Sequence, residues 1–301
     1  MDSLSNVKIS VIIPIYNHGD YVLECLRSVV NQRDVCFEIV AIDDGSSDNS
    51  YGLALEYLGE SLVTTNWKLT KRENRGINKT INEAIQNSSG EIIYLLASDD
   101  RMPDGSLAKI RQTYLNETER CKLFFYDIAL ISWQGELVNQ SAASVRRGGA
   151  SLLGYSKMYL ATQIVLSWGS PFANQFYPRD YYERYGPYPE DLKYEDLYFA
   201  LNAISVDRFI FVPFVLKEYR LRKNQTHTPG LTLADLDQTN VLVRNRFKKS
   251  IKLRYSLVLF VGSLYFNVDK NVFKYLLGKI GSLIQRSAYW WALFRIESTS
   301  K

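Results

Sequence analysis

Strand and helix signals alternate over the first hundred residues, and few folds are compatible with that order. Continuous apolar runs rich in β-branched residues occur at residues 8–16, 37–42 and 91–97, with a weaker run within 62–71. Helical spacing of apolar residues separates these runs, at residues 20–31, 48–59 and 78–87. Because parallel strands need crossover connections of this kind, the pattern predicts an α/β fold with an open, mostly parallel central sheet.

The rest of the chain is less regular. We expect a helix at 104–115, strands within 122–145 joined by a turn at Gly135, and a loop-rich stretch at 146–190. A helix at 193–205, a short strand at 209–215 and a break at 226–230 follow. These segments predict a second half that packs against the sheet begun by the first.

Polar side chains follow three of the predicted strands, at the point where each strand ends. They are Tyr16-Asn17, Asp43-Asp44 and Ser98-Asp99-Asp100. In open parallel sheets ligands bind at the carboxyl ends of the strands, which meet at one edge. The three clusters are therefore expected to lie together there.

The two carboxylate pairs among these clusters suit different ligands. Asp43 and Asp44 can accept hydrogen bonds from a nucleotide base or a ribose, although an Asx turn that caps the next helix is an alternative. Asp99 and Asp100 would repel each other unless a cation shared them, and a divalent ion held with substrate phosphates would do so. The alternative there is a solvated turn before Pro103.

A third acidic pair, Glu195-Asp196, stands at the start of the predicted helix at 193–205. A carboxylate at such a position can act as a general base. Acidic residues in the first turn also stabilise any helix through its dipole, and this is the alternative reading.

Taken together, these segments resemble family 2 glycosyltransferases over roughly residues 7–228. The resemblance rests on five motifs in order: SVIIPIYNHGDYVLECLRSVVNQ, EIVAIDDGSSDNS, ENRGINKTINEAIQNSSGEIIYLLASDD, GPYPEDLKYEDLYFAL and EYRLRKNQTH. It implies a Rossmann-like GT-A fold and transfer of a sugar by a single inverting displacement.

The resemblance also implies roles for individual residues. It places Pro14, Tyr16 and Asn17 beside the base and ribose, and Asp44, with Asp43 next to it, on the base. It implies that the ribose and diphosphate lie over Asn74, Gly76 and Lys79, and that Ser98 borders the donor site. It assigns metal binding to Asp99 and Asp100. It implies that Asp196 is the catalytic base that takes the proton, and that Glu195 orients Asp196 or contacts the acceptor.

Two positions depart from the family pattern. The first carboxylate of the usual Asp-x-Asp-Asp is replaced by Ala97, and the position that often holds a histidine ligand is Arg222. We therefore expect Mn²⁺ or Mg²⁺ to be held mainly by Asp99 or Asp100 and by the substrate, with Arg222 contacting the diphosphate.

The resemblance implies a division of the chain and an activity. A GT-A domain at 1–230 would comprise a nucleotide-sugar half at about 1–103 and an acceptor half at about 104–230. We expect transfer from a UDP-sugar to a hydroxyl of a lipid-linked glycan in surface polysaccharide (O-antigen or capsule) synthesis. Direct glycosylation of a polyprenyl phosphate, and a degenerate transferase that binds a nucleotide sugar or polysaccharide without turnover, are the alternatives.

The last seventy residues differ in charge from the body. Residues 231–301 carry 12 Lys/Arg against 4 Asp/Glu, which leaves 24 against 28 for residues 1–230. Basic residues mixed with interfacial aromatics predict a helical extension that lies on an anionic membrane, although packing on the domain is the alternative. The N-terminus has no signal-peptide pattern, so we expect a cytoplasmic protein, peripheral on the inner face of the plasma membrane.

Other function classes lack their sequence signals. The chain has no GxGxxG or GxxxxGK[ST], and its two histidines, His18 and His227, have no zinc-ligand spacing. No nucleic-acid recognition module accompanies the basic residues, so nucleic acid is not an expected partner.

Overall fold

The computed structural model describes residues 7–60, 65–142, 161, 174–193, 195–221, 242–243 and 246–247. The helices in these residues are α1 (Val22–Val30), α2 (Ser50–Leu58), α3 (Ile77–Gln86), α4 (Ser106–Asn116), α7 (Arg179–Tyr185) and α8 (Asp196–Val206). The strands are β1 (Ile9–Ile15), β2 (Phe37–Asp43), β3 (Asn66–Lys71), β4 (Ile92–Leu95), β5 (Leu123–Ile131), β6 (Leu137–Asn139), β7 (Gln175–Pro178) and β8 (Phe209–Arg220).

One sheet runs through both halves of the described chain. Its order is β3-β2-β1-β4-β7-β5-β6, with β8 paired to β5. The first four strands are parallel, as the alternating pattern predicted. In the second half β7 is antiparallel to both β4 and β5, whereas β8 is parallel to β5. The predicted α/β fold with a mostly parallel sheet is confirmed.

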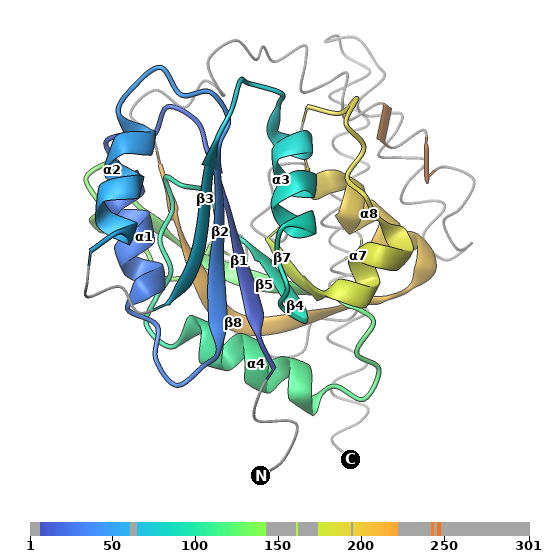
Figure 1. Ribbon diagram of the computed structural model, residues 1–301. Coiled ribbons are helices and arrows are strands. Elements are labelled where there is room, and N and C mark those ends of the chain that lie inside the picture. The colour runs from blue at the N-terminus through green and yellow to red at the C-terminus, as the bar shows by residue number, and fades with distance from the viewer. Residues whose placement is uncertain are drawn as a thin grey trace, which may run out of the picture.

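Helices cover the two faces of this sheet (Figure 1). Apolar residues form one core on each face. One core joins α1, α2 and α4 to the face that carries Ile9, Val11 and Ile13 of β1. The other joins α3, α7 and α8 to the opposite face, where Ile12 of the same strand points. The continuous apolar run of β1 is therefore buried on both sides.

Aromatic residues hold α8 against the sheet. Tyr177 of β7, Tyr181 of α7 and Tyr188 all surround Phe199 of α8, and the Tyr188 and Phe199 rings stack with centroids 4.1 Å apart. The hydroxyls of Tyr177 and Tyr188 lie 2.7 Å apart, so each buried polar group has a partner. This cluster fixes the start of α8, where the acidic pair lies.

Two expectations for the second half are corrected in the described residues. Of the stretch at 146–190, expected to be loop-rich, the structure describes residues 161 and 174–190; these include β7 and α7, and β7 lies in the middle of the sheet. The short strand expected at 209–215 continues to Arg220, because its polar end pairs with the segment after β4: the N–H of Glu218 donates to the carbonyl of Arg101 at 2.8 Å. The expected break at 226–230 and most of the predicted extension at 231–301 lie outside the described residues.

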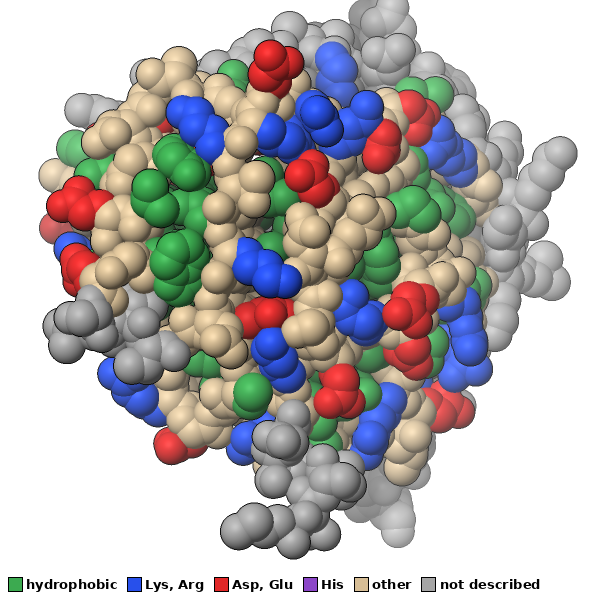
Figure 2. All heavy atoms as spheres, viewed as in Figure 1, with side chains coloured by type: hydrophobic (Ala, Val, Ile, Leu, Met, Phe, Trp, Pro, Cys, Tyr) green, Lys and Arg blue, Asp and Glu red, His purple; other side chains and the backbone are tan. Residues whose placement is uncertain are grey.

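The surface of the described domain carries both signs of charge. Acidic and basic side chains are interspersed over the face shown in Figure 2. Within the residues that the structure describes, no helix has the length and apolar character needed to cross a bilayer.

Candidate functional site

The loops that follow β1 and β2 are joined by hydrogen bonds at the carboxyl edge of the sheet. The N–H of Asn17 donates to Ser46 Oγ at 3.0 Å, and Asn17 Oδ1 accepts the N–H of Ser47 at 2.8 Å. The N–H of Gly19 donates to Asp48 Oδ2 at 2.9 Å. Asn17 adopts a left-handed backbone (φ 52°), which an asparagine tolerates, and this turns its side chain toward the second loop. Two of the three predicted clusters therefore lie side by side.

Asp44 fastens this edge to the turn before α3. Its Oδ1 accepts the N–H of Arg75 at 2.8 Å, its Oδ2 accepts the N–H of Gly76 at 3.0 Å, and the Arg72 guanidinium donates to Oδ1 as well. Neighbouring Gly45 has φ 79°, and a Cβ there would lie 2.7 Å from the backbone nitrogen of Asn74. The carboxylate predicted to meet the base thus braces the turn at 72–76.

Asp43 lies beneath the same loop. It is fully buried, and its Oδ1 accepts the N–H of Ser46 at 2.9 Å. Its other oxygen has no hydrogen-bond partner among the described residues. Asp43 therefore forms the Asx turn that was the alternative interpretation of the sequence, and its Oδ2 remains available as an acceptor.

His18 links the third cluster to the first. Its Nδ1 lies 2.8 Å from Ser98 Oγ and 3.7 Å from Asp99 Oδ1. Ser98 is fully buried. His18 was not among the predicted site residues, because one histidine in a turn carries no spacing signal; its position directly after a strand end is the hint that was available.

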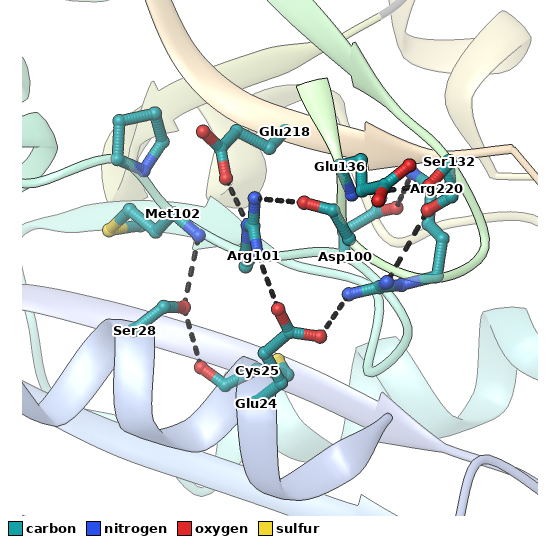
Figure 3. A network of polar contacts seen from close by, with 12 residues as sticks. Glu24, Cys25, Ser28, Asp100, Arg101, Met102, Ser132, Glu136, Glu218 and Arg220 are labelled. Atoms are coloured by element: carbon teal, nitrogen blue, oxygen red, sulfur yellow. Dashed lines mark hydrogen bonds and ion pairs between the residues drawn. The ribbon is translucent and has the colours of Figure 1, made fainter. Parts of the chain in front are cut away.

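Asp99 and Asp100 are held by the end of β8. The backbone N–H of Arg220 donates to Asp100 Oδ1 at 3.0 Å, and Arg220 Nε donates to the carbonyl of Asp99 at 2.8 Å. The other end of the guanidinium pairs with Glu24 of α1 (Figure 3). The Arg220 side chain is 1% exposed. One buried arginine therefore connects β8, α1 and the segment after β4.

A second arginine completes this network. Arg101 pairs with Glu218 of β8 and with Glu24, and it donates to the carbonyl of Gly135 at 2.7 Å (Figure 3). Arg101, Glu218 and Glu24 were not predicted, since charged residues scattered over 200 positions give no local motif.

A buried lysine lies against Asp100. Lys217 Nζ is 3.2 Å from Asp100 Oδ2, and both residues are less than a tenth exposed. Burial raises the pKa of Asp100 to about 6, against the opposing effect of Lys217. Burial alone would lower the pKa of Lys217, but Asp100 outweighs it, and the pKa is raised. Lys217 was also missed, because the predicted strand ended at residue 215.

Glu195 and Asp196 stand at the first turn of α8. Asp196 Oδ1 accepts the N–H of Leu197 at 2.9 Å, and the residue is an acid in the first turn of the helix, where the alternative interpretation placed it. Both side chains are half-buried. Burial raises the pKa of both carboxyls, and the charge of Glu195 raises that of Asp196 further. Of the two carboxyls, Asp196 has the more clearly raised pKa, and it is therefore the one better suited to take up a proton.

Two buried amides of α3 hold the segment in front of α8. Asn78 Nδ2 donates to the carbonyls of Pro189 and Leu192, at 2.9 and 2.6 Å. Asn82 Nδ2 donates to the carbonyl of Tyr188 at 2.9 Å, and its Oδ1 accepts the N–H of the same residue at 2.9 Å. These contacts tie the first half of the chain to the acidic pair of the second.

The remaining predicted residues occupy looser positions. Pro14 and Tyr16 are half-buried at the end of β1, and Asn74 is exposed in the turn braced by Asp44. Lys79 of α3 is exposed and pairs with Glu190 at 3.5 Å. Arg222 lies outside the described residues.

The described residues contain no group of three or more His, Cys, Asp or Glu side chains placed to hold a metal ion. Asp100 faces Lys217 and the Arg220 N–H. Divalent cations that act on nucleotides are commonly held by one or two carboxylates and by substrate phosphates. Asp99 fits such a partial site as a single carboxylate ligand.

The first part of the chain matches a known family. Residues 10–129 match the model for glycosyl transferase family 2. Among curated relatives, the putative glycosyltransferase EpsH of Bacillus subtilis is 31% identical over 111 residues, which are 37% of this chain and 31% of EpsH. The poly(ribitol-phosphate) beta-glucosyltransferase of Bacillus spizizenii is 36% identical over 109 residues, 35% of this chain and 16% of that one. The matched segment thus spans about a third or less of these relatives.

Solved structures match over more of the chain. Staphylococcus aureus TarS 1–349 in complex with UDP-GlcNAc has a TM-score of 0.62 at 22% identity and covers 86% of this chain and 72% of its own. The mannosyltransferase PcManGT of Pyrobaculum calidifontis, in complex with GDP-Man and Mn²⁺, has a TM-score of 0.65 at 16% identity, with coverage of 97% and 79%. Residues 10–129 are thus similar to glycosyl transferase family 2, and the chain has the GT-A fold.

Proposed function

We propose that this chain is an inverting glycosyltransferase that moves a sugar from a UDP-sugar to a hydroxyl acceptor. The observation that carries the proposal is the hydrogen-bonded edge formed by Asn17, Ser46, His18 and Ser98 at the carboxyl ends of β1, β2 and β4. Ligands of open α/β sheets bind at this edge. TarS, which has the same fold, was solved with UDP-GlcNAc, and this supports a uridine nucleotide as donor.

The donor would lie along the braced edge. Pro14, Tyr16 and Asn17 would border the base and ribose, and the exposed turn with Asn74 and Gly76 would cover them. Because Asp44 already holds that turn, we propose that its main effect on the donor is to position these two residues. Asp43, with one free acceptor oxygen, would complete the base site.

Asp196 would act as the general base. Its carboxylate would take the proton of the acceptor hydroxyl while that oxygen attacks the anomeric carbon from the face opposite the nucleotide. The bond from this carbon to the diphosphate breaks in the same step, so the nucleoside diphosphate leaves and the configuration inverts. Glu195 beside it keeps the pKa of Asp196 high enough for proton transfer.

A divalent cation would be held at Asp99 together with the diphosphate. Mn²⁺ or Mg²⁺ supplies positive charge that stabilises the leaving diphosphate. PcManGT was solved with Mn²⁺ and a nucleotide sugar, which supports this cofactor. Arg222, two residues beyond the end of β8, would add a second positive charge.

The acceptor and location are proposed from the relatives and the tail. A poly(ribitol-phosphate) glucosyltransferase among the relatives supports an acceptor in surface polysaccharide synthesis, and we propose a lipid-linked glycan. The basic residues of 231–301 would bring the enzyme to an anionic membrane, where such an acceptor lies.

The test combines binding with turnover. A screen of nucleotide sugars by thermal shift, with and without Mn²⁺, identifies the donor, because a tight ligand raises the unfolding temperature. Donor hydrolysis should then fall about 1,000-fold in Asp196→Asn, since a general base contributes roughly 10²–10⁴-fold. The matched control is Asp180→Asn, an exposed acid in the first turn of α7. Donor binding without any turnover in the wild type would instead indicate a binding module.

A further inference from the structure

Lys217 is a charged residue in an unusual place. Its side chain is 11% exposed, and its backbone pairs with Ile128 inside the sheet. Removing an ammonium group from water is costly unless a carboxylate compensates it. The compensating group is Asp100, whose side chain is 1% exposed and whose Oδ2 lies 3.2 Å from Lys217 Nζ.

The two adjacent carboxylates of this segment point in different directions. Both oxygens of Asp100 face β8, one toward Lys217 Nζ and the other toward the N–H of Arg220. Asp99 Oδ1 instead lies 3.7 Å from His18 Nδ1, on the side of the strand-end loops. Asp100 Oδ2 accepts no hydrogen bond within the described residues, so its ion pair with Lys217 is what holds this oxygen on the β8 side.

The ammonium also affects the acidic pair of α8. The positive charge of Lys217 lowers the pKa of both Glu195 and Asp196, opposing their burial. One fixed cation therefore lies within electrostatic reach of the two carboxylate pairs that the sequence assigned to metal and base. This is consistent with a role in the site and not only in the core.

We propose that Lys217 is a positioning residue that anchors Asp100 in the fold, so that Asp99 alone is presented to the cation and diphosphate of the donor. The proposal rests on the proposed function, because it assigns the ligands of that same site. It also gives a physical reason for the arrangement: the charge of the anchored carboxylate is neutralised by the chain itself, and no cation is needed to share the pair.

The first variant removes the charge and keeps most of the length of the side chain. In Lys217→Met, Asp100 loses its partner and the segment that carries Asp99 shifts. We expect the affinity for Mn²⁺ in the presence of UDP, measured by calorimetry, to fall about 10–100-fold, as it does when a group that orients a metal ligand is removed. Lys217→Arg, which keeps the charge, should recover part of this loss.

The second variant separates an anchor from a ligand. Asp100→Asn combined with Lys217→Met removes both charges of the pair but leaves Asp99 and its contact with Arg220. We expect its affinity for Mn²⁺ and UDP to return to within about threefold of the wild type, because coupled partners are not additive. The matched control is Lys122→Met, which breaks another largely buried pair, with Glu117, roughly 20 Å away along β5.

If the double variant no longer binds Mn²⁺ but still binds UDP, Asp100 is itself a metal ligand and the proposal is wrong. It is also wrong if Lys217→Met lowers only the unfolding temperature, to the same extent as Lys122→Met, with unchanged Mn²⁺ affinity. Failure of the wild type to bind any uridine nucleotide would instead overturn the proposed function.

Discussion

The two halves of the sheet use their carboxylates in opposite ways. In the parallel half, Asp44 accepts two backbone N–H groups and a guanidinium. In the mixed half, Glu195 and Asp196 lie next to each other, and the pKa of each is raised. Carboxylates satisfied by the chain build a rigid surface, whereas a like-charged pair retains a tendency to take up protons. We therefore expect the first half to bind the donor and the second to take up the proton.

The largest effect is expected where the binding half is most tightly braced. Asp44→Ala would leave the N–H groups of Arg75 and Gly76 without their acceptor and would remove one partner of Arg72. Because both members of that ion pair are largely buried, we expect a loss of about 3 kcal/mol in the free energy of unfolding. Urea denaturation measures the loss, and the KM for the donor should rise as well.

The control for this variant changes the charge and not the shape. Asp44→Asn keeps one acceptor oxygen, so its loss of stability should be smaller than that of Asp44→Ala. Equal stability of all three proteins would show that the turn at 72–76 does not depend on this carboxylate.

A smaller effect is expected at the contact between the halves. Asn82→Ala removes the partner of both backbone groups of Tyr188 and of the Tyr182 hydroxyl. Leaving such groups unpaired in the interior costs about 2 kcal/mol. We expect kcat to fall more than the KM for the donor, because the loosened segment leads to Asp196. Gln86→Ala, at an exposed position of the same helix, is the control and should change neither quantity.

These contacts also show what the sequence could predict. The bounds of β1, β2 and α1 follow from apolar runs and helical spacing, and the convergence of their loops follows from the topology of parallel sheets. By contrast, β7 has four residues and ends in Pro178, so it offers no periodicity, although it is central in the sheet. A strand of that length is specified by its neighbours and not by its own pattern.

The site residues also fall into those that a local pattern could predict and those that only the fold brings close. Residues in local motifs, such as Asp44, Asp99 and Asp196, were named from the sequence, although their roles stay predictions. The groups that hold them, Lys217 and Arg220, lie about 120 positions from the carboxylates they contact. Only the parallel pairing of β8 with β5 brings them to the end of β4, and a single sequence gives no signal for that pairing.

A smaller effect is expected from the backbone conformation of Gly76, in the turn that Asp44 holds. Gly76 has φ 88° and ψ 157°, a region that only glycine adopts readily, and a Cβ there would meet no atom within 4 Å. Gly76→Ala should therefore cost about 1.5 kcal/mol through backbone strain alone, and it should raise the KM for the donor. Gly105, with φ 74° and equally open surroundings, lies outside the braced turn. Gly105→Ala should lower stability but leave that KM unchanged; a similar KM change in both would argue against a specific role for the turn.

The pH dependence of turnover tests the role of the acidic pair Glu195-Asp196 directly. Burial and the neighbouring Glu195 raise the pKa of Asp196 to about 8. A protonated carboxyl cannot accept a proton, so kcat/KM should increase with pH and level off above this pKa. Glu195→Gln removes the negative charge that raises the pKa, and we expect the rising limb to move about one unit lower, equivalent to about 1.4 kcal/mol. A limb that stays in place would show that burial alone sets the pKa of Asp196, and the two carboxylates would then not act as a pair.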